Sequence, residues 1–488
     1  GGSRAFMAAY NSWNGIPMSI HPCLEEITRK QWGNNGIICT DGGALKLLIE
    51  AHKSFPSFAE GAAAVVKATT GQFLDAYVPY VKEALEKGLL TEVDIDKAIR
   101  GNIFVALKLG LLDGDNSRNP YLSIGKNSTE TPPFMTAEAR RLAREVTAKS
   151  VVLLKNKKLL PLDAGKLRKI AVIGPYSDKI VQDWYSGTPP YETTILSGIR
   201  NAVKEGTEII HAEDNRMGQA EKAAAAADVA IVCVGNHPYG TRADWKFSPV
   251  PSDGREAVDR KSLMLPDEDL VKLVLKANPN TILVLVSSFP YTINWSQEHV
   301  PAIVHITHCS QEQGNGLADV LFGKVNPAGR TVQTWVKDIT DLPDIMDYDI
   351  RNGRTYMYHQ GPVLYPFGYG LSYSDFTYEK IESVKQDKKN IRVTVSVKNT
   401  SGRDGEEVVQ LYASYPDSKV ERPSKQLRAF RRIPIKAGET RKVTLTVPKE
   451  ELGYWNEGKQ MFVVEPGTVK LLIGASSEDI RLEGKIRL

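Results

Sequence analysis

Asp41 is a candidate catalytic carboxylate because it directly follows an apolar run. Residues 36–40 are small, apolar or β-branched and predict a buried strand that ends at Asp41, and Gly42 and Gly43 come next. Barrel enzymes place their catalytic groups at the carboxyl ends of parallel strands. An aspartate that only caps the following helix would give the same pattern, so position alone favours neither role.

A second candidate carboxylate, Glu256, lies in a long polar loop after the strand predicted at 230–235. Loops of this length inside a domain are usually functional or disordered. This one contains Arg255-Glu256-Ala257-Val258-Asp259-Arg260. Either acid could serve in catalysis, and either could instead pair with a neighbouring arginine at the surface. The aromatic residues of the loop are Tyr239, Trp245 and Phe247.

The segment around Asp41, residues 1–113, is expected to be part of a βα-repeat domain. Strand-like runs alternate with helical patterns, and this alternation predicts a parallel sheet with crossover helices. Two or three strands cannot close a barrel. The segment is therefore expected to be the end of a larger domain. The strands are expected at 5–10 and 36–40, and the helices at 24–32, 58–69, 77–87 and 92–109.

Two further domains are expected after a linker at 114–135 that is rich in Gly, Asn, Ser, Thr and Pro. Residues 136–364 alternate helices and strands, which predicts an open α/β/α sandwich with its sites at the carboxyl ends of the strands. Residues 365–488 contain seven alternating, β-branched runs separated by turn residues, which predicts an immunoglobulin-like β-sandwich. In the α/β/α sandwich, strands are expected at 151–154, 169–173, 230–235, 281–286 and 302–306, and helices between them include 217–227 and 268–277. In the β-sandwich, the seven strands are expected at 377–384, 390–399, 406–414, 426–435, 440–448, 458–464 and 468–475.

Composition and charge restrict the partner. The chain has 62 basic and 58 acidic side chains, a formal net charge of +4, and no basic stripe or acidic tail. Nucleic acid and an anionic membrane surface are therefore disfavoured, and an uncharged substrate fits better. The cysteines have no metal-ligand spacing and form no disulfide framework; they are Cys23, Cys39, Cys233 and Cys309.

Short motifs run in a fixed order along the whole chain. They are Met7-Ala8-Ala9-Tyr10-Asn11, Asn14-Gly15-Ile16-Pro17, Thr40-Asp41, Lys149-Ser150-Val151-Val152-Leu153-Leu154-Lys155-Asn156, Asn326-Pro327-Ala328-Gly329-Arg330, Tyr365-Pro366-Phe367-Gly368-Tyr369-Gly370-Leu371-Ser372-Tyr373 and Glu465-Pro466-Gly467. Together they resemble glycoside hydrolase family 3. The resemblance implies the C-terminal part of a (β/α)8, TIM-like barrel at 1–113, then an α/β/α sandwich, then a fibronectin type III-like domain.

The resemblance also implies roles for the candidate residues. Asp41 matches the nucleophile of the family, and Glu256, in a Glu-x-x-Asp-Arg motif, matches the acid/base. Tyr10 matches a tyrosine beside the nucleophile in the subsite for the sugar that is released, and Met7 a neighbouring substrate-binding position. Gly42 stands where many members carry a tryptophan. Trp245 or Phe247 could supply this wall of the substrate site instead, and packing of the loop aromatic into its own domain is an equally good interpretation.

These residue types suit retaining hydrolysis. One carboxylate attacks the anomeric carbon, and a second carboxyl group, roughly 5–5.5 Å away, protonates the leaving oxygen. The phenol of Tyr10 could hydrogen-bond the nucleophile and hold it ionised. This chemistry requires no metal and no organic cofactor.

Two further departures from the family pattern are visible. The upstream half of the barrel, with its Lys-His motif, has no counterpart, so the chain is expected to require that segment, on a separate chain or an additional part of the same one. The stretch Gly71-Gln72-Phe73 before Asp75 also differs from the family pattern, without an evident reason in the sequence.

The expected function is that of an exo-acting retaining β-glycosidase, first of all a β-glucosidase, acting on oligosaccharides or on aryl and alkyl β-glycosides. A β-xylosidase or another β-glycosidase of the family is an alternative. A non-catalytic sugar-binding or complementing fragment is another. A homodimer is compatible with the sequence, and the expected location is the periplasm or the exterior of the cell.

Overall fold

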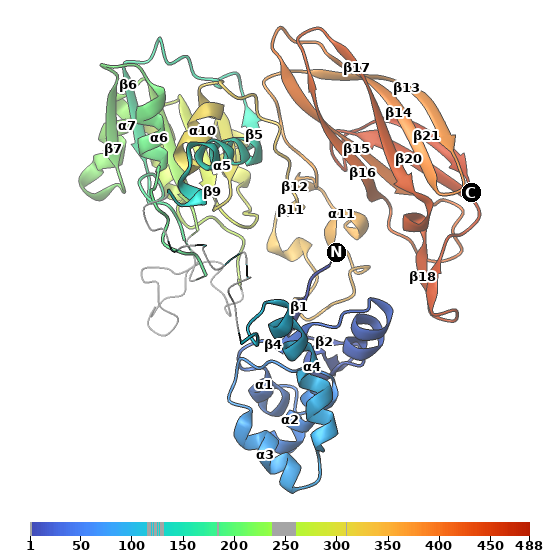
Figure 1. Ribbon diagram of the computed structural model, residues 1–488. Helices are drawn as coiled ribbons and strands as arrows, with labels where there is room; N and C mark the ends of the chain where they lie inside the picture. Colours follow the sequence, from blue (N-terminus) through green and yellow to red (C-terminus); the bar gives the residue numbers. More distant parts are fainter. Residues whose placement is uncertain are drawn as a thin grey trace. The chain divides into compact units, whose positions relative to one another are not determined.

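The computed structural model describes residues 2–114, 119, 121, 124, 126, 131–182, 185–236, 260–308 and 310–488. The chain divides into two compact units, Gly1–Thr131 and Pro132–Leu488 (Figure 1). Among the described residues, no helix combines the length and the apolar composition needed to cross a bilayer.

The first unit is built on parallel strands accompanied by helices. β1 (Ala5–Ala8) and β4 (Ile37–Thr40) pair in parallel with Met7 opposite Cys39, and an isolated parallel bridge joins Cys39 to Gln72. The βα pattern is as predicted, but the helix expected at 24–32 is wound as a π-helix. The further elements are the hairpin β2 (Ser12–Trp13) and β3 (Ile16–Pro17), the π-helix η2 (Leu24–Gln31), α1 (Ala44–Glu50), α2 (Phe58–Lys67), α3 (Val78–Glu86) and α4 (Glu92–Lys108).

Local sequence sets where these helices begin. The side chain of Ser57 accepts a hydrogen bond from the backbone amide of Glu60 at 3.3 Å and so caps the start of α2. Thr91 and Asp94 form a reciprocal capping box at the start of α4. Apolar residues three apart on α1 and on α2 then pack the two helices together, and Tyr77, at the start of α3, joins the same buried cluster: Leu45, Leu48, Ala62, Val65 and Tyr77.

The second unit contains a six-stranded sheet in the order β5-β10-β9-β8-β6-β7, parallel except for the antiparallel edge strand β5. The strand β8 shows why helices cover both faces. Ile231 and Cys233 enter one buried cluster, and Val232 and Val234 enter the other. The strands are β5 (Val152–Asn156), β6 (Lys169–Ile173), β7 (Glu208–Ala212), β8 (Val229–Gly235), β9 (Thr281–Val286) and β10 (Ala302–Ile306).

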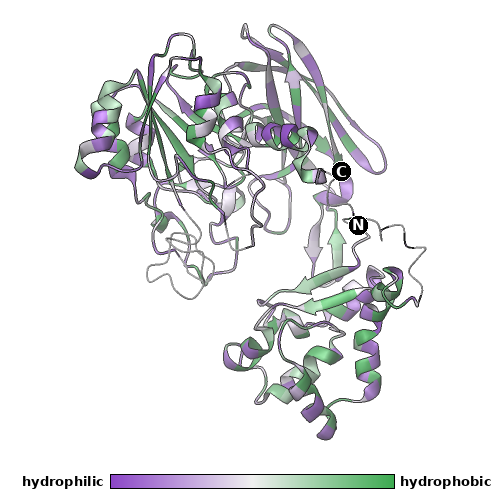
Figure 2. Cartoon of the chain, turned by 60° about the vertical axis from the view of Figure 1, so that its left-hand side comes forward, coloured by the Kyte–Doolittle hydropathy of each residue, from purple (hydrophilic) through white to green (hydrophobic). Residues whose placement is uncertain are grey.

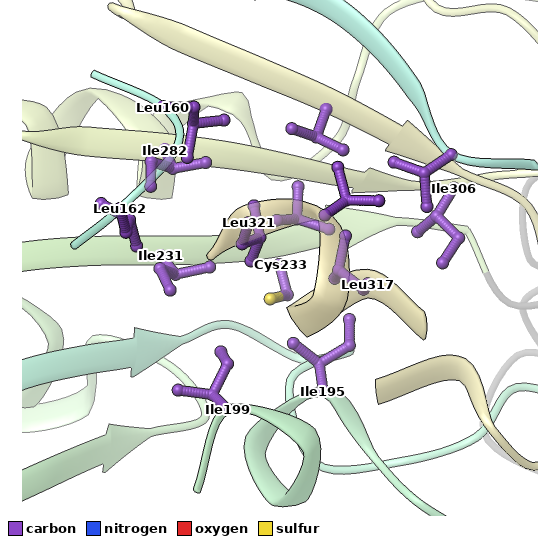
Figure 3. Packing of buried hydrophobic residues seen from close by; sticks show 14 of the residues in the cluster. Leu160, Leu162, Ile195, Ile199, Ile231, Cys233, Ile282, Ile306, Leu317 and Leu321 are labelled. Carbon is purple, nitrogen blue, oxygen red and sulfur yellow. The ribbon is translucent and has the colours of Figure 1, made fainter. Parts of the chain in front are cut away.

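The helices close the two faces of this sheet. α5 (Ala137–Ser150), α6 (Ile195–Ala202) and α10 (Gln313–Leu321) contribute residues to the first cluster, part of which is drawn in Figure 3. α7 (Gln219–Ala226) and α8 (Glu268–Ala277) contribute to the second. The central strands are coloured mainly as hydrophobic in Figure 2, as expected for a sheet that is buried on both sides. The predicted α/β/α sandwich is therefore present.

The same unit ends in a β-sandwich of two antiparallel sheets, β13-β14-β17 and β16-β15-β20-β21. Inward-facing valine, leucine and isoleucine side chains of both sheets form its core. The seven strands are β13 (Phe376–Gln386), β14 (Asn390–Asn399), β15 (Gly405–Ser414), β16 (Gln426–Ile435), β17 (Thr440–Pro448), β20 (Thr468–Gly474) and β21 (Ile480–Arg487). A short strand pair, β11 (Trp335–Val336) and β12 (Val363–Tyr365), precedes the sandwich.

Two details of the β-sandwich differ from the sequence prediction. The run at 458–464, expected as a sheet strand, forms instead part of a separate hairpin, β18 (Tyr454–Asn456) with β19 (Met461–Val463). The strand β21 was not expected, because charged residues alternate along it and its pattern resembles a solvated segment. Its antiparallel pairing with β20 supplies the backbone hydrogen bonds of a strand, which its charged composition did not predict.

Candidate active site

Asp41 lies directly after β4, at the carboxyl end of a parallel strand. Its Oδ1 accepts the amide of Gly42 at 2.7 Å, and its carbonyl oxygen accepts the amide of Ala44 at 3.3 Å. Gly43 then adopts a left-handed conformation, with φ of 81°, and α1 begins at Ala44. A glycine suits this position because side chains disfavour that backbone conformation. The carboxylate is therefore held on a tight turn between strand and helix.

Tyr10 reaches the same turn from the loop after β1. Its hydroxyl donates a hydrogen bond to the carbonyl oxygen of Gly42, the residue next to Asp41. The ring of His52 lies 2.9 Å from the Tyr10 carbonyl oxygen and 3.4 Å from the hydroxyl of Ser12, so it fixes the loop that carries the tyrosine. Tyr10 thus contacts the backbone of the turn that carries Asp41. The predicted hydrogen bond from its phenol to the Asp41 carboxylate stays a prediction.

Met7 shares a face of the strand pair with this site. It lies opposite Cys39 in the parallel register, and Asp41 follows Cys39 by two residues. Side chains two apart on a strand point to the same side. The Met7 side chain is 51% exposed, so its surface is open to a ligand on that face. Its role in substrate binding stays a prediction.

Asp75 is a residue of this site that the sequence did not single out. Its Oδ1 accepts the amide of Gly43 at 2.5 Å, and its Oδ2 accepts the amide of Leu45 at 3.5 Å. Helix α1 has no capping side chain of its own, so Asp75 supplies the missing acceptors from 30 residues away. The turn that carries Asp41 is consequently anchored by Tyr10 at Gly42 and by Asp75 at Gly43.

The unusual stretch before Asp75 now has a structural reason. The amide of Thr40 donates to the Gln72 carbonyl at 3.0 Å, and the amides of Gly71 and Gln72 lie within 3.2 Å of the Ile38 carbonyl. These residues therefore run alongside β4 as a further strand segment. The ring of Phe73 stacks on buried Tyr77 at 4.0 Å and fixes the exit of the segment. Together these contacts place Asp75 beside the start of α1.

Exchange of Asp75 for alanine is expected to lower kcat by roughly 10- to 100-fold with little change in KM, because a displaced nucleophile costs rate more than binding. Asp94→Ala is the matched control, since it also removes an acceptor at a helix start in the same unit. Both variants should lose about 1 kcal/mol of unfolding free energy. Equal kcat values for the two variants would reduce Asp75 to a purely structural cap. Steady-state kinetics and urea denaturation provide the measurements.

Glu256 and Trp245 lie outside the described residues, and both assignments stay predictions. The two ends of their loop are described. The amide of Ser288 donates to Asn236 Oδ1 at 3.2 Å. Arg260 lies over the rings of Phe289 and Tyr291, with its guanidinium carbon 3.7 and 4.9 Å from the ring centroids. Arg260 also donates to the carbonyl oxygen of Pro290 at 3.2 Å. Both ends of the loop are therefore attached to the segment that follows β9.

The stacking of Arg260 is the other feature that the sequence did not reveal. The sequence offered only an ion pair with an acid of the loop as a structural role for an arginine here, and the structure adds the packing of the Arg260 guanidinium on aromatic rings about 30 residues further along the chain. Arginine suits such a position because its planar cation stacks on ring faces and keeps its charge. The arginine that ends the motif thereby anchors the loop.

His305 is a buried histidine near the carboxyl end of β10, in the six-stranded sheet. Burial lowers the pKa of His305 to about 4. Its Nε2 lies 3.0 Å from the Ser287 carbonyl oxygen, and its ring meets Trp335 edge-on at 5.3 Å. In the part of the chain that the structure describes, no three His, Cys, Asp or Glu side chains gather as a metal site would need. The histidine is consequently a neutral packing residue at physiological pH.

This histidine should make the second unit less stable in acid. With a pKa of about 4 when folded and 6.5 when free, the unfolded chain binds a proton in this window that the folded chain does not. The unfolding free energy should therefore fall between pH 6.5 and pH 4, by about 2–3 kcal/mol. Denaturant titrations of His305→Gln at pH 7 and 4.5 should lack that part of the loss. His299→Gln, at an exposed histidine, is the control and should keep it.

Comparison with known proteins places the chain in a family. Three family models match: the glycosyl hydrolase family 3 N-terminal domain over residues 1–101, its C-terminal domain over 151–373, and a fibronectin type III-like domain over 407–477. A periplasmic β-glucosidase of Salmonella typhimurium is 30% identical over 98% of this chain and 67% of its own length. A β-xylosidase of Formosa agariphila is 29% identical over 98% of this chain and 68% of its own length.

Solved structures agree with this placement. The β-glucosidase of Listeria innocua in complex with isofagomine has a TM-score of 0.84 and 26% identity, covering 100% of this chain and 68% of its own. The chain thus spans about two thirds of the length of these relatives. Sequence and fold lead to the same conclusion: this chain belongs to glycosyl hydrolase family 3.

Proposed function

We propose that the chain carries the catalytic carboxylates of an exo-acting retaining β-glycosidase, with β-glucosides as the preferred substrates. The observation that carries this proposal is the turn at Asp41, a carboxylate at a parallel strand end whose backbone is held by Tyr10 and Asp75. Such preorganisation is what a nucleophile needs. The β-glucosidases among its relatives support the choice of sugar.

The proposed reaction has two steps. Asp41 attacks the anomeric carbon while the carboxyl group of Glu256 protonates the departing oxygen, which leaves a glycosyl ester on Asp41. Glu256, now a carboxylate, then removes a proton from a water molecule that hydrolyses the ester. Two inversions at the same carbon retain its configuration. Side-chain groups and water suffice for both steps.

The stereochemistry of the first product tests this mechanism. Proton NMR during hydrolysis of an aryl β-glucoside should show the β-anomer first, with the α-anomer appearing only by mutarotation. Initial release of the α-anomer would contradict a retaining mechanism. A folded chain that turns over no β-glycoside would instead favour the non-catalytic fragment.

A β-xylosidase is the second candidate, because the relative from Formosa agariphila with this name matches over nearly the same lengths. Rates on 4-nitrophenyl β-glucoside and β-xyloside compare the two sugars with one leaving group. The larger kcat/KM identifies the preferred sugar.

We also propose an exported, periplasmic location, supported by the relative from Salmonella typhimurium. For the domains we propose the divisions 1–113, 136–364 and 365–488 with a linker at 114–135, supported by the ranges of the family models.

A further inference from the structure

A cavity of about 710 Å³ lies at one end of the β-sandwich, entirely within the second unit. Three stretches that are distant in the sequence form it: residues around α11 (Thr355–Tyr358), the connection from β15 to β16, and η6 (Lys449–Leu452) with the hairpin β18–β19. The hairpin extends from the β-sandwich where β18 is labelled in Figure 1. A volume of this size is in the usual range of pockets for small ligands.

Arg422 joins two of these stretches and gives the cavity a fixed wall. Its guanidinium carbon lies 3.7 Å from the centroid of the Tyr415 ring, at the end of β15. The same group donates a hydrogen bond to the carbonyl oxygen of Leu452, in η6, at 2.8 Å. The Arg422 side chain is only 6% exposed. The wall is therefore formed before a ligand arrives, which lowers the cost of ordering it on binding.

Aromatic rings line the cavity and continue beyond it onto the hairpin. Tyr358, Tyr454 and Phe462 belong to the lining. Trp455 lies directly opposite Phe462 in the hairpin register, and their rings meet edge-on at 5.3 Å. Residues opposite each other in an antiparallel pair share a face. Because Phe462 is 67% exposed and Trp455 is 48% exposed, the two rings form one open aromatic surface beside the cavity.

Charges of both signs line the cavity. The carboxylates are those of Glu421, Glu450 and Glu451, and the guanidinium groups are those of Arg422 and Arg428. An anionic ligand would be repelled by the carboxylates, and a polyamine or a basic peptide would be repelled by the arginines. The lining therefore favours a ligand without net charge.

The polar groups of the lining include both acceptors and donors of hydrogen bonds. Glu450 and Glu451 are exposed carboxylates, which can only accept. The Oε1 atom of Gln426 accepts a hydrogen bond from Arg428, which fixes that oxygen and leaves the NH2 group as the donor toward a ligand. A hydroxyl group both donates and accepts. A neutral ligand with many hydroxyl groups and apolar ring faces consequently matches the polar groups and the aromatic rings together.

We propose that this cavity and the adjoining aromatic surface bind a chain of neutral, β-linked sugars at a site separate from catalysis. The choice of a neutral sugar follows from the lining, and the β linkage rests on the proposed function. One sugar ring stacks on Phe462, the next one contacts Trp455, and the hydroxyl groups of the first ring donate to the carboxylates of η6. The site holds a polysaccharide to the protein without cleaving it.

Two substitutions of Phe462 test the flat ring while they preserve the packing of the hairpin. Phe462→Leu keeps an apolar side chain against Trp455 but removes the ring face on which a sugar would stack. Phe462→Tyr keeps the ring. Phe430→Leu, on β16, is the matched control because Phe430 is 66% exposed and lies outside the lining of this cavity.

Affinity gel electrophoresis measures the binding, with mixed-linkage β-glucan or arabinoxylan, both neutral polymers, cast into a native gel. At least one of them should retard the wild-type chain, and the retardation should persist at about 1 M NaCl, where interactions between charges are screened. For Phe462→Leu the dissociation constant should rise roughly fivefold, the effect of one lost aromatic contact. Phe462→Tyr and Phe430→Leu should stay within about twofold of the wild type, since both keep the Phe462-position ring.

Three results would overturn the site. Neither neutral polymer retards the wild-type chain, or Phe462→Leu is retarded as strongly as the wild type. In the third, polygalacturonate retards the chain in a way that disappears at high salt, which would show a site for anions.

Binding and turnover fail separately. A polymer has few chain ends, so an exo-acting site contributes little to retardation, and Asp41→Ala should be retarded like the wild type. A chain that is retarded but hydrolyses no β-glycoside would keep this site and remove the proposed function. A chain that hydrolyses an aryl β-glucoside without retardation by either polymer would keep the proposed function and remove this site.

Discussion

Replacement of Asp41 by alanine should lower kcat on an aryl β-glucoside by about 10⁴-fold or more, because the covalent intermediate can no longer form. The turn around Asp41 uses backbone atoms for its contacts with Tyr10 and Asp75, so these contacts do not depend on the carboxylate. Near-normal folding is therefore expected. Asp96→Ala, at an exposed carboxylate on α4, is the control and should keep wild-type activity.

Added azide makes this result specific to a nucleophile. Without its side chain, the site has room for azide to attack the anomeric carbon from the same face. One displacement inverts that carbon, so the expected product is the α-glucosyl azide. Full activity in Asp41→Ala, or the β-glucosyl azide as its product, would remove Asp41 from the nucleophilic role.

The sequence predicted the buried elements of the fold well, because their apolar patterns follow directly from the burial of those side chains. The strand expected at 230–235 is β8 (Val229–Gly235), buried throughout, and the helix expected at 268–277 is α8. Elements held by distant contacts were harder to predict. The apolar spacing at 24–32 indicated a helix, whereas its π-helical winding is accompanied by bonds from Arg29 to the carbonyl oxygens of Asn34 and Gly36.

The same difference between local patterns and distant contacts applies to the candidate active site. Asp41 could be singled out as a candidate because an acid after an apolar strand is a local pattern. Asp75 was not, because its partners Gly43 and Leu45 lie 32 and 30 residues away and its own neighbours suggest only a loop. The packing role of Arg260 likewise depends on Phe289 and Tyr291, which follow β9 and lie beside it only in the folded chain. Residues that act through tertiary contacts leave no short-range signal in a single sequence.

Replacement of Glu256 by alanine should affect substrates according to their leaving groups, because a general acid matters only when the departing oxygen needs a proton. For alkyl β-glucosides, kcat/KM should fall by about 10²- to 10⁴-fold. For 2,4-dinitrophenyl β-glucoside, whose leaving group is stable as an anion, it should stay near the wild-type value. The ester on Asp41 would then accumulate, since no base activates water, and both kcat and KM should fall together.

The neighbouring Asp259 is the necessary comparison, since either acid of the Glu-x-x-Asp-Arg motif could donate the proton. Asp259→Ala should lower activity on all leaving groups alike, if at all. Azide again reports the role: it attacks the ester on Asp41 in Glu256→Ala, so two displacements occur and the product is the β-glucosyl azide. The α product in Asp41→Ala and the β product in Glu256→Ala together assign the two carboxylates, because only a nucleophile and a separate acid give opposite configurations. If Asp259→Ala, and not Glu256→Ala, lost activity only on substrates with poor leaving groups, the general acid would be Asp259, three residues further along the chain and next to Arg260.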